Sequence, residues 1–157
     1  MKFLISKKLS KKSPIFPPLI GLLLFFLVGI AYNAAYIHSK ISLVPQAALE
    51  NILGNEEAFV EPLLPEELLA IVHVELLFFM FVLPLLFFIY YRLYQNSRIT
   101  KELVTAFLFI QCAMIALAFS QVVGIWFVYL FLVSYFAANT MLLYIIVRTL
   151  WKLVRNG

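Results

Sequence analysis

Two ionisable residues, His73 and Glu75, lie inside an apolar stretch that runs from Leu68 to Phe88. Histidine is a ligand for haem iron, and a carboxyl group within a membrane can carry a proton or bind a cation. On a helix, residues two apart are separated by about 200°, so His73 and Glu75 cannot both face one small ligand. His73 shares a helix face with Glu66, whereas Glu75 needs partners from other helices.

The two histidines of the chain, His38 and His73, both lie near the same side of the predicted membrane spans. Haem b in helical bundles is held by histidines from different helices, so this pair could hold one. Their depths differ by about 7 Å when counted along the helices, which disfavours the haem. A quinone bonded to His73 or Glu75 is the alternative ligand. We expect no metal site, because no close pair of the H-x-x-x-H kind occurs.

Four polar amide residues also fall within apolar segments. Asn33 and Gln121 lie in the same outer half of the membrane as Glu75. Gln111 and Asn139 lie at matching depths on neighbouring spans, which predicts a hydrogen bond between them worth about 1 kcal/mol. Nothing continues from Glu75 into the inner half of the membrane, so the sequence shows no continuous proton relay.

The elements that must position these residues are transmembrane helices. The chain of 157 residues is 64% hydrophobic and only 13% charged, with a mean hydropathy of +1.00. A soluble domain carries about a quarter charged residues, so this composition excludes a soluble globule. A span needs about 20 apolar residues to cross about 30 Å of hydrocarbon. Four segments qualify, at about 17–37, 68–91, 103–122 and 126–150, and the last two are expected to form a hairpin that turns near Gly124.

The charges sort to the two sides of this predicted bundle. By the positive-inside rule, we expect both termini to be cytoplasmic. For a prokaryotic cell, we expect the membrane to be the cell (inner) membrane. Of the 12 basic residues, only Lys40 lies on the outer side. The other eleven lie on the cytoplasmic side: Lys2, Lys7, Lys8, Lys11, Lys12, Arg92, Arg98, Lys101, Arg148, Lys152 and Arg155. The net charge of +4 is therefore a signal of topology, and we expect no binding to nucleic acid.

The outer loop, at about 38–67, is the one sizeable segment outside the membrane. It contains six glutamates, and its residues 45–53 predict a short amphipathic helix that stops at Gly54. About thirty residues are too few for a catalytic domain. We therefore expect a single transmembrane domain over residues 1–157.

Small residues recur at spacings of four within the spans, which lets helix backbones approach closely. The three pairs are Ala31 and Ala35, Ala116 and Ser120, and Ser134 and Ala138. We expect all of them to pack within the bundle.

No catalytic motif occurs, and the chain contains no aspartate. The sequence therefore predicts an all-α membrane protein, a four-helix transmembrane bundle without catalytic activity of its own. The main functional hypothesis is a small subunit of a larger membrane complex, respiratory or transport-related, with the bilayer and other subunits as partners. The alternatives are an electron-transfer subunit that binds haem b or quinone through His38, His73 and Glu75, and a small proton-coupled transporter that depends on Glu75.

Overall fold

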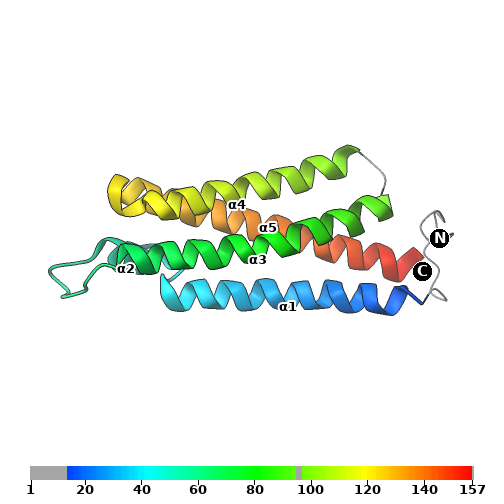
Figure 1. Ribbon diagram of the computed structural model, residues 1–157, viewed down its shortest axis with the longest axis horizontal. Helices are drawn as coiled ribbons and strands as arrows, with labels where there is room; N and C mark the ends of the chain where they lie inside the picture. Colours follow the sequence, from blue (N-terminus) through cyan, green and yellow to red (C-terminus); the bar gives the residue numbers. More distant parts are fainter. Residues whose placement is uncertain (1–13, 95–96, 157) are drawn as a thin grey trace.

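The computed structural model describes residues 14–94 and 97–156, and it is built from one short helix and four long ones (Figure 1). The only β-type pairing among these residues is a single bridge between Asn55 and Val60. The helices are α1 (Phe16–Lys40), α2 (Pro45–Leu53), α3 (Pro65–Tyr94), α4 (Ser97–Val123) and α5 (Ile125–Asn156).

The four long helices are each long and apolar enough to cross a membrane: Phe16–Lys40, Pro65–Tyr91, Lys101–Val123 and Ile125–Arg155. The predicted all-helical class with four candidate spans is therefore confirmed. The helices extend beyond the apolar segments because backbone hydrogen bonding continues into the polar membrane surface. α4, for example, begins at Ser97, several residues before its apolar part.

The hairpin of α4 and α5 is the centre of the bundle, and these two helices are the most closely packed pair. They are joined at Gly124, whose φ of 90° is a conformation that favours glycine. The Gly124 N–H donates to the Ser120 carbonyl over 2.8 Å and so closes α4. α1 packs mainly on α5, and α3 packs mainly on α4.

Small side chains line the interface of this hairpin, as expected. Ala116, Ser120 and Ala138 are fully buried. The prediction is wrong for Ala31 and Ala35, which are exposed on α1. The reason is the phase of the helix: the buried positions of α1 recur every three or four residues, and both alanines fall between them. The buried positions are Leu23, Phe26, Ile30, Asn33 and Ile37.

The loop between α1 and α3 lies at one end of the bundle, which we call the α2 end (Figure 1). α2 has two fully buried residues, Ala48 and Ile52, and packs on the ends of α4 and α5. Gly54 ends the helix with φ of 82°. The start of α1 and the end of α5 lie at the opposite end of the bundle.

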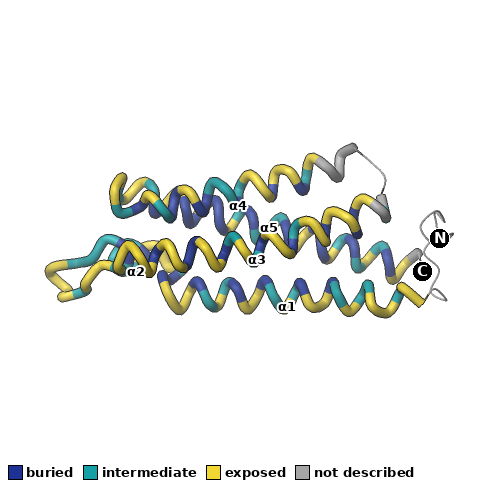
Figure 2. The backbone as a smooth tube through the Cα atoms, in the orientation of Figure 1, coloured by how far each residue is buried: buried dark blue, intermediate teal, exposed yellow. Residues whose placement is uncertain are grey.

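Most of the surface along the four long helices is apolar. Figure 2 shows the buried residues on the inward faces of the helices and exposed ones on the outward faces. Large hydrophobic side chains such as Phe25, Met80 and Val133 are highly exposed, at 69%, 71% and 66%. A surface of this kind suits lipid, because apolar side chains that contact acyl chains are not exposed to water.

Candidate functional site

Three polar side chains from three different helices meet inside the bundle. Asn33 of α1 donates from Nδ2 to Oε2 of Glu75 on α3 over 2.8 Å, and to the hydroxyl of Tyr135 on α5 over 3.4 Å. All three are buried, with exposed fractions of 5% for Asn33, 0% for Glu75 and 2% for Tyr135. We call these residues the central cluster. The partner that Glu75 requires is therefore supplied by the chain itself.

The helix pattern explains why these three residues meet. Each occupies a place where the apolar stripe of its helix would otherwise carry a core side chain: Asn33 follows Ile30 by three residues, and Glu75 follows Ile71 by four. Glu75 lies ten residues after Pro65, about 15 Å along the helix from that end. The cluster is thus well inside the span, closer to the α2 end.

The hydrogen bonds of the central cluster are incomplete. Oε1 of Glu75 is buried and has no hydrogen-bond partner among the described residues, and the same holds for Oδ1 of Asn139, one turn after Tyr135. The Tyr135 hydroxyl accepts from Asn33 and keeps its own hydrogen for another acceptor. A buried acceptor without a donor is costly. The carboxyl oxygen of Glu75 can bind a proton, a water molecule or a cation, and the amide oxygen of Asn139 can bind a water molecule or a cation.

The predicted hydrogen bond between Gln111 and Asn139 is absent. Asn139 donates from Nδ2 to the carbonyl of Tyr135 on its own helix over 2.9 Å, so its amide is used locally. The side-chain link between α4 and α5 at this level lies instead between Ser134 and Cys112, over 3.4 Å. Matching depth along two helices does not determine how two side chains are oriented around the helix axes.

The two histidines are both exposed, and they differ in their contacts. Nδ1 of His38 accepts the Leu43 backbone N–H over 3.1 Å, which stabilises the turn after α1. A neutral imidazole that accepts at Nδ1 carries its hydrogen on Nε2, so while this bond is formed neither nitrogen has a lone pair free for iron. His73 makes no hydrogen bond to any described residue. It faces away from Glu75, as the helical spacing predicted.

Gln121 has a structural role. Its Nε2 donates to the carbonyls of Ile52, over 3.1 Å, and Leu63, over 2.5 Å. It therefore ties the end of α2 and the segment before α3 to the end of α4. In the described ranges 14–94 and 97–156, no group of three or more His, Cys, Asp or Glu side chains could hold a metal ion.

A second polar group lies near the opposite end of the bundle, and the sequence analysis did not identify it. The Tyr90 hydroxyl donates to Oε2 of Glu102 over 2.6 Å, and Arg148 forms an ion pair with Oε1 of Glu102 at 3.1 Å. The same Arg148 nitrogen donates to the hydroxyls of Tyr90 and Tyr144. We call these four residues the Arg148 cluster. The available signal was Glu102, an acidic residue among the basic residues of that side.

These features define an integral membrane protein of the all-α, multi-pass class, whose apolar helices contact the lipid bilayer. Residues 42–157 match the Aq_1264_TM family, a transmembrane helical domain. Because the match covers well over half of the 157 residues, the chain belongs to this family. Comparison with curated proteins and with solved structures gave no match.

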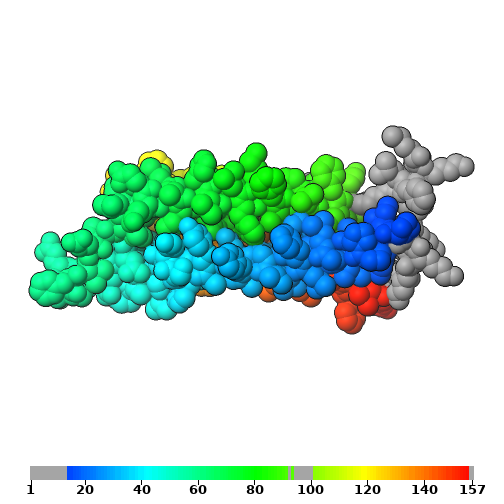
Figure 3. All heavy atoms as spheres, turned by 60° about the horizontal axis from the view of Figure 1, so that its bottom comes forward, coloured from blue at the N-terminus to red at the C-terminus, as the bar shows by residue number. Residues whose placement is uncertain are grey.

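The family match divides the central cluster. Glu75 and Tyr135 lie within the matched residues, whereas Asn33 lies on α1, before the match begins at residue 42. The amide that donates to Glu75 therefore comes from a helix outside the matched region. α1 and α3 lie side by side along one face of the bundle, seen in Figure 3 in blue to cyan and in green.

Proposed function

We propose that this protein is a small, non-catalytic subunit of a larger membrane complex. The observation that carries the proposal is the outward position of His73. The residue lies eight residues after Pro65, about 12 Å along α3, where its side chain is exposed on the surface of the bundle. Ionisable side chains inside a membrane face protein or a water-filled cavity almost without exception. A neighbouring subunit that covers His73 would satisfy this rule.

The exposed small residues of α1 support the same proposal. Ala31 and Ala35 are one turn apart on the outside of the bundle, and in membranes such pairs are enriched where helices touch. α3 carries an exposed Ala70 one turn before His73. The face formed by α1 and α3 (Figure 3) is therefore where we place the contact with other subunits.

Copurification tests this proposal directly. A tagged protein extracted in mild detergent should bring down other membrane subunits in fixed stoichiometry, and His73→Leu should reduce their yield severalfold. Tyr129→Leu is the matched control, since it changes a polar-tipped, 40% exposed side chain on α5. Purification of the unaltered protein as a monomer without partners would contradict the proposal, and an equal effect of both substitutions would remove His73 from the interface.

The proposed orientation places both termini in the cytoplasm and the α2 end outside, in the inner membrane of a prokaryotic cell. The support is the distribution of basic residues. Lys2, Lys7, Lys8, Lys11 and Lys12, and the side chains of Arg92 and Arg98, lie outside the described residues. Cysteine labelling from each side of the membrane, at introduced positions in the 54–60 loop and at Lys101, tests this topology.

A second candidate function is favoured by the incomplete hydrogen bonding of Glu75. A fully buried carboxyl group with a free oxygen, beside a tyrosine hydroxyl, can take up and release a proton or a monovalent cation. The protein would then be a small proton-coupled transporter that acts through the central cluster. In proteoliposomes, Glu75→Gln should abolish proton or cation uptake, while Gln111→Leu should leave it unchanged.

A haem or quinone remains the third hypothesis, with less support. His38 would have to break its hydrogen bond with Leu43 before it could bind iron. A quinone needs only one hydrogen-bond donor, which His73 could provide on the exposed face of α3. Absorbance spectra of the oxidised and reduced protein test the haem, since a Soret band with a sharp alpha band requires it. Extraction of the purified protein and analysis of any bound quinone test the quinone.

A further inference from the structure

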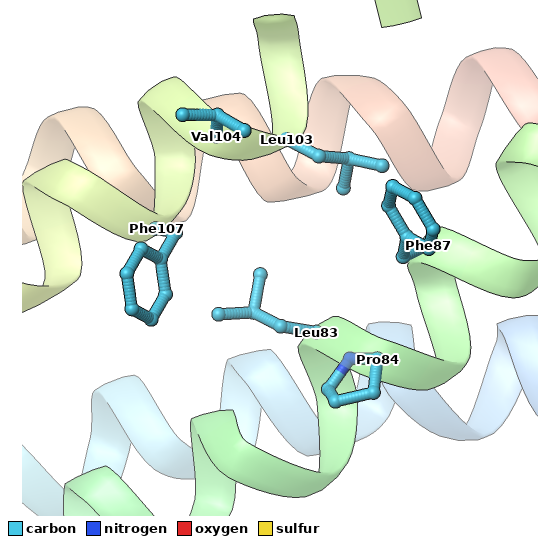
Figure 4. Close-up of a pocket in the computed structure, with 6 residues that line it drawn as sticks. All are labelled: Leu83, Pro84, Phe87, Leu103, Val104 and Phe107. Atoms are coloured by element: carbon cyan, nitrogen blue, oxygen red, sulfur yellow. The ribbon is translucent and has the colours of Figure 1, made fainter. Parts of the chain in front are cut away.

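A groove between α3 and α4 opens on the membrane-facing surface of the bundle. Its volume is about 190 Å³, and Figure 4 shows side chains from both helices bordering the same space. α3 contributes Leu83, Pro84 and Phe87, and α4 contributes Leu103, Val104 and Phe107. The groove lies toward the end of the bundle opposite α2.

The local sequence explains why a space remains here. Pro84 lies inside α3 and has no backbone N–H, so the carbonyl four residues earlier lacks its helical partner and the helix packs less regularly. α3 packs less closely on α4 than α5 does. Val104 is 48% exposed and Phe107 45%, so the groove is open to the hydrocarbon of the bilayer.

The lining selects an apolar occupant. All six side chains are hydrocarbon, and a polar ligand would lose its hydration there without gaining a hydrogen bond. An acyl chain fits this chemistry, because it is supplied by the surrounding bilayer.

The charges near the mouth of the groove point to the headgroup. Lys101 is exposed and lies one turn before Val104, about 4.5 Å along α4 toward the end of the bundle. It forms no ion pair with any described residue. The adjacent carboxylate of Glu102 is instead compensated by Arg148 at 3.1 Å and by Tyr90 at 2.6 Å. The free charge at the mouth is therefore positive, as required for a lipid phosphate.

We propose that this groove binds one anionic phospholipid, with an acyl chain along Leu83 and Phe107 and its phosphate at Lys101. The site does not depend on the central cluster, on His73 or on membership of a complex. A lipid bound here would fill the space left by Pro84 and so stabilise the contact between α3 and α4.

Native mass spectrometry of the whole protein tests the proposal. The protein is placed in nanodiscs that contain equal amounts of phosphatidylglycerol and phosphatidylcholine with identical acyl chains, and the retained lipids are counted after release. The unaltered protein should retain one phosphatidylglycerol in preference to phosphatidylcholine. Lys101→Gln should lower this preference about fivefold, since one lysine near the headgroups contributes about 1 kcal/mol.

Two further variants test the position of the acyl chain. Val104→Trp fills the groove and Phe107→Ala removes one wall, and both should lower total lipid retention. Phe107→Ala keeps the test valid if the tryptophan disturbs folding. The matched controls are Lys40→Gln, at the α2 end, and Val133→Trp, on the exposed face of α5.

Three results would overturn the proposal. Equal retention of the two lipids would mean that the protein holds only unselective surrounding lipid. A preference that Lys101→Gln leaves unchanged would place the headgroup elsewhere. A retained molecule without a phosphate, such as a quinone or a neutral lipid, would assign the groove to another ligand.

Discussion

The two polar clusters of this protein each contain a carboxyl group and a tyrosine, and they differ in how the carboxyl group is compensated. In the Arg148 cluster, Glu102 receives an ion pair and a tyrosine hydrogen bond, and its side chain is 24% exposed. In the central cluster, Glu75 is fully buried and receives a single amide hydrogen bond. Only the second arrangement leaves a buried carboxyl oxygen without a partner, so only the second retains unused binding capacity.

This difference distinguishes a carboxyl group that stabilises the fold from one that is available for function. A carboxyl group near the membrane surface with a nearby arginine is stabilised at little cost. A carboxyl group well inside the span gains less from one neutral amide than its burial costs, and it persists because it is used or because a partner completes it. We expect four sets of variants to reveal this difference, with effects on stability that decrease from Asn33 to Gln121.

Asn33→Leu should have the largest effect on stability. It removes the one hydrogen-bond donor that Glu75 has in the described part of the chain and leaves the buried carboxyl group without a partner there, at a cost of about 2–3 kcal/mol. The measurement is the free energy of unfolding in mixed micelles. Tyr32→Leu, on the neighbouring exposed position of the same helix, should change it little.

The double substitution of Asn33 and Glu75 by leucine sharpens this result. If the cost of the single substitution arises from an unpaired carboxyl group, the double variant should recover about 1–2 kcal/mol of the loss, because no carboxyl group is then left unpaired. Simple addition of the two single effects would show that the two residues are not energetically coupled. The double variant should at the same time be inactive in the transport assay.

Arg148→Met should have a smaller effect, of about 1–2 kcal/mol. It leaves Glu102 with only its tyrosine hydrogen bond, but both side chains of the pair are partly exposed, at 37% and 24%, so water can replace part of the interaction. Addition of Glu102→Gln should restore most of this loss. The same unfolding assay measures it, and an effect larger than that of Asn33→Leu would reverse the ranking of the two clusters.

Gln121→Leu should have the smallest effect, about 1 kcal/mol, as expected for a neutral side chain that binds two carbonyls near the surface. Its consequence should be local, because it frees the 54–63 loop from α4. Limited proteolysis should show faster cleavage in this loop with little change in the unfolding of the spans. Faster cleavage throughout the protein would indicate that Gln121 stabilises the whole bundle.

The helices, and the angle between two side chains on the same helix, could be predicted from the sequence. The long apolar segments predict helices because a backbone within lipid must satisfy its own hydrogen bonds. The opposite faces of His73 and Glu75 follow from the helical repeat alone. Spacing also contained the signal for Asn33, since the residue occupies a buried place in the apolar stripe of α1, at the level where Glu75 needs a partner.

The errors all concern pairs of helices. Gln111 and Asn139 were expected to bond from their depths, yet Asn139 bonds to its own backbone. Ala31 and Ala35 were expected inside the bundle and are exposed. The Arg148 cluster joins α3, α4 and α5, and its residues are separated by up to 58 positions in the chain. Depth along one axis does not determine which way two helices face each other.

The amino-acid sequence was enough to predict that this protein is helical, that four of its helices can span a membrane, and where His73 and Glu75 point relative to each other. These properties follow from backbone hydrogen bonding, hydrophobic length and helical periodicity, which are local. The packing of the helices was needed to show that Asn33 is the partner of Glu75, that Glu102 is compensated by Arg148, and that a groove remains beside Pro84. These properties depend on how each helix is rotated and packed against its neighbours, which is the result of many contacts between residues distant in the chain.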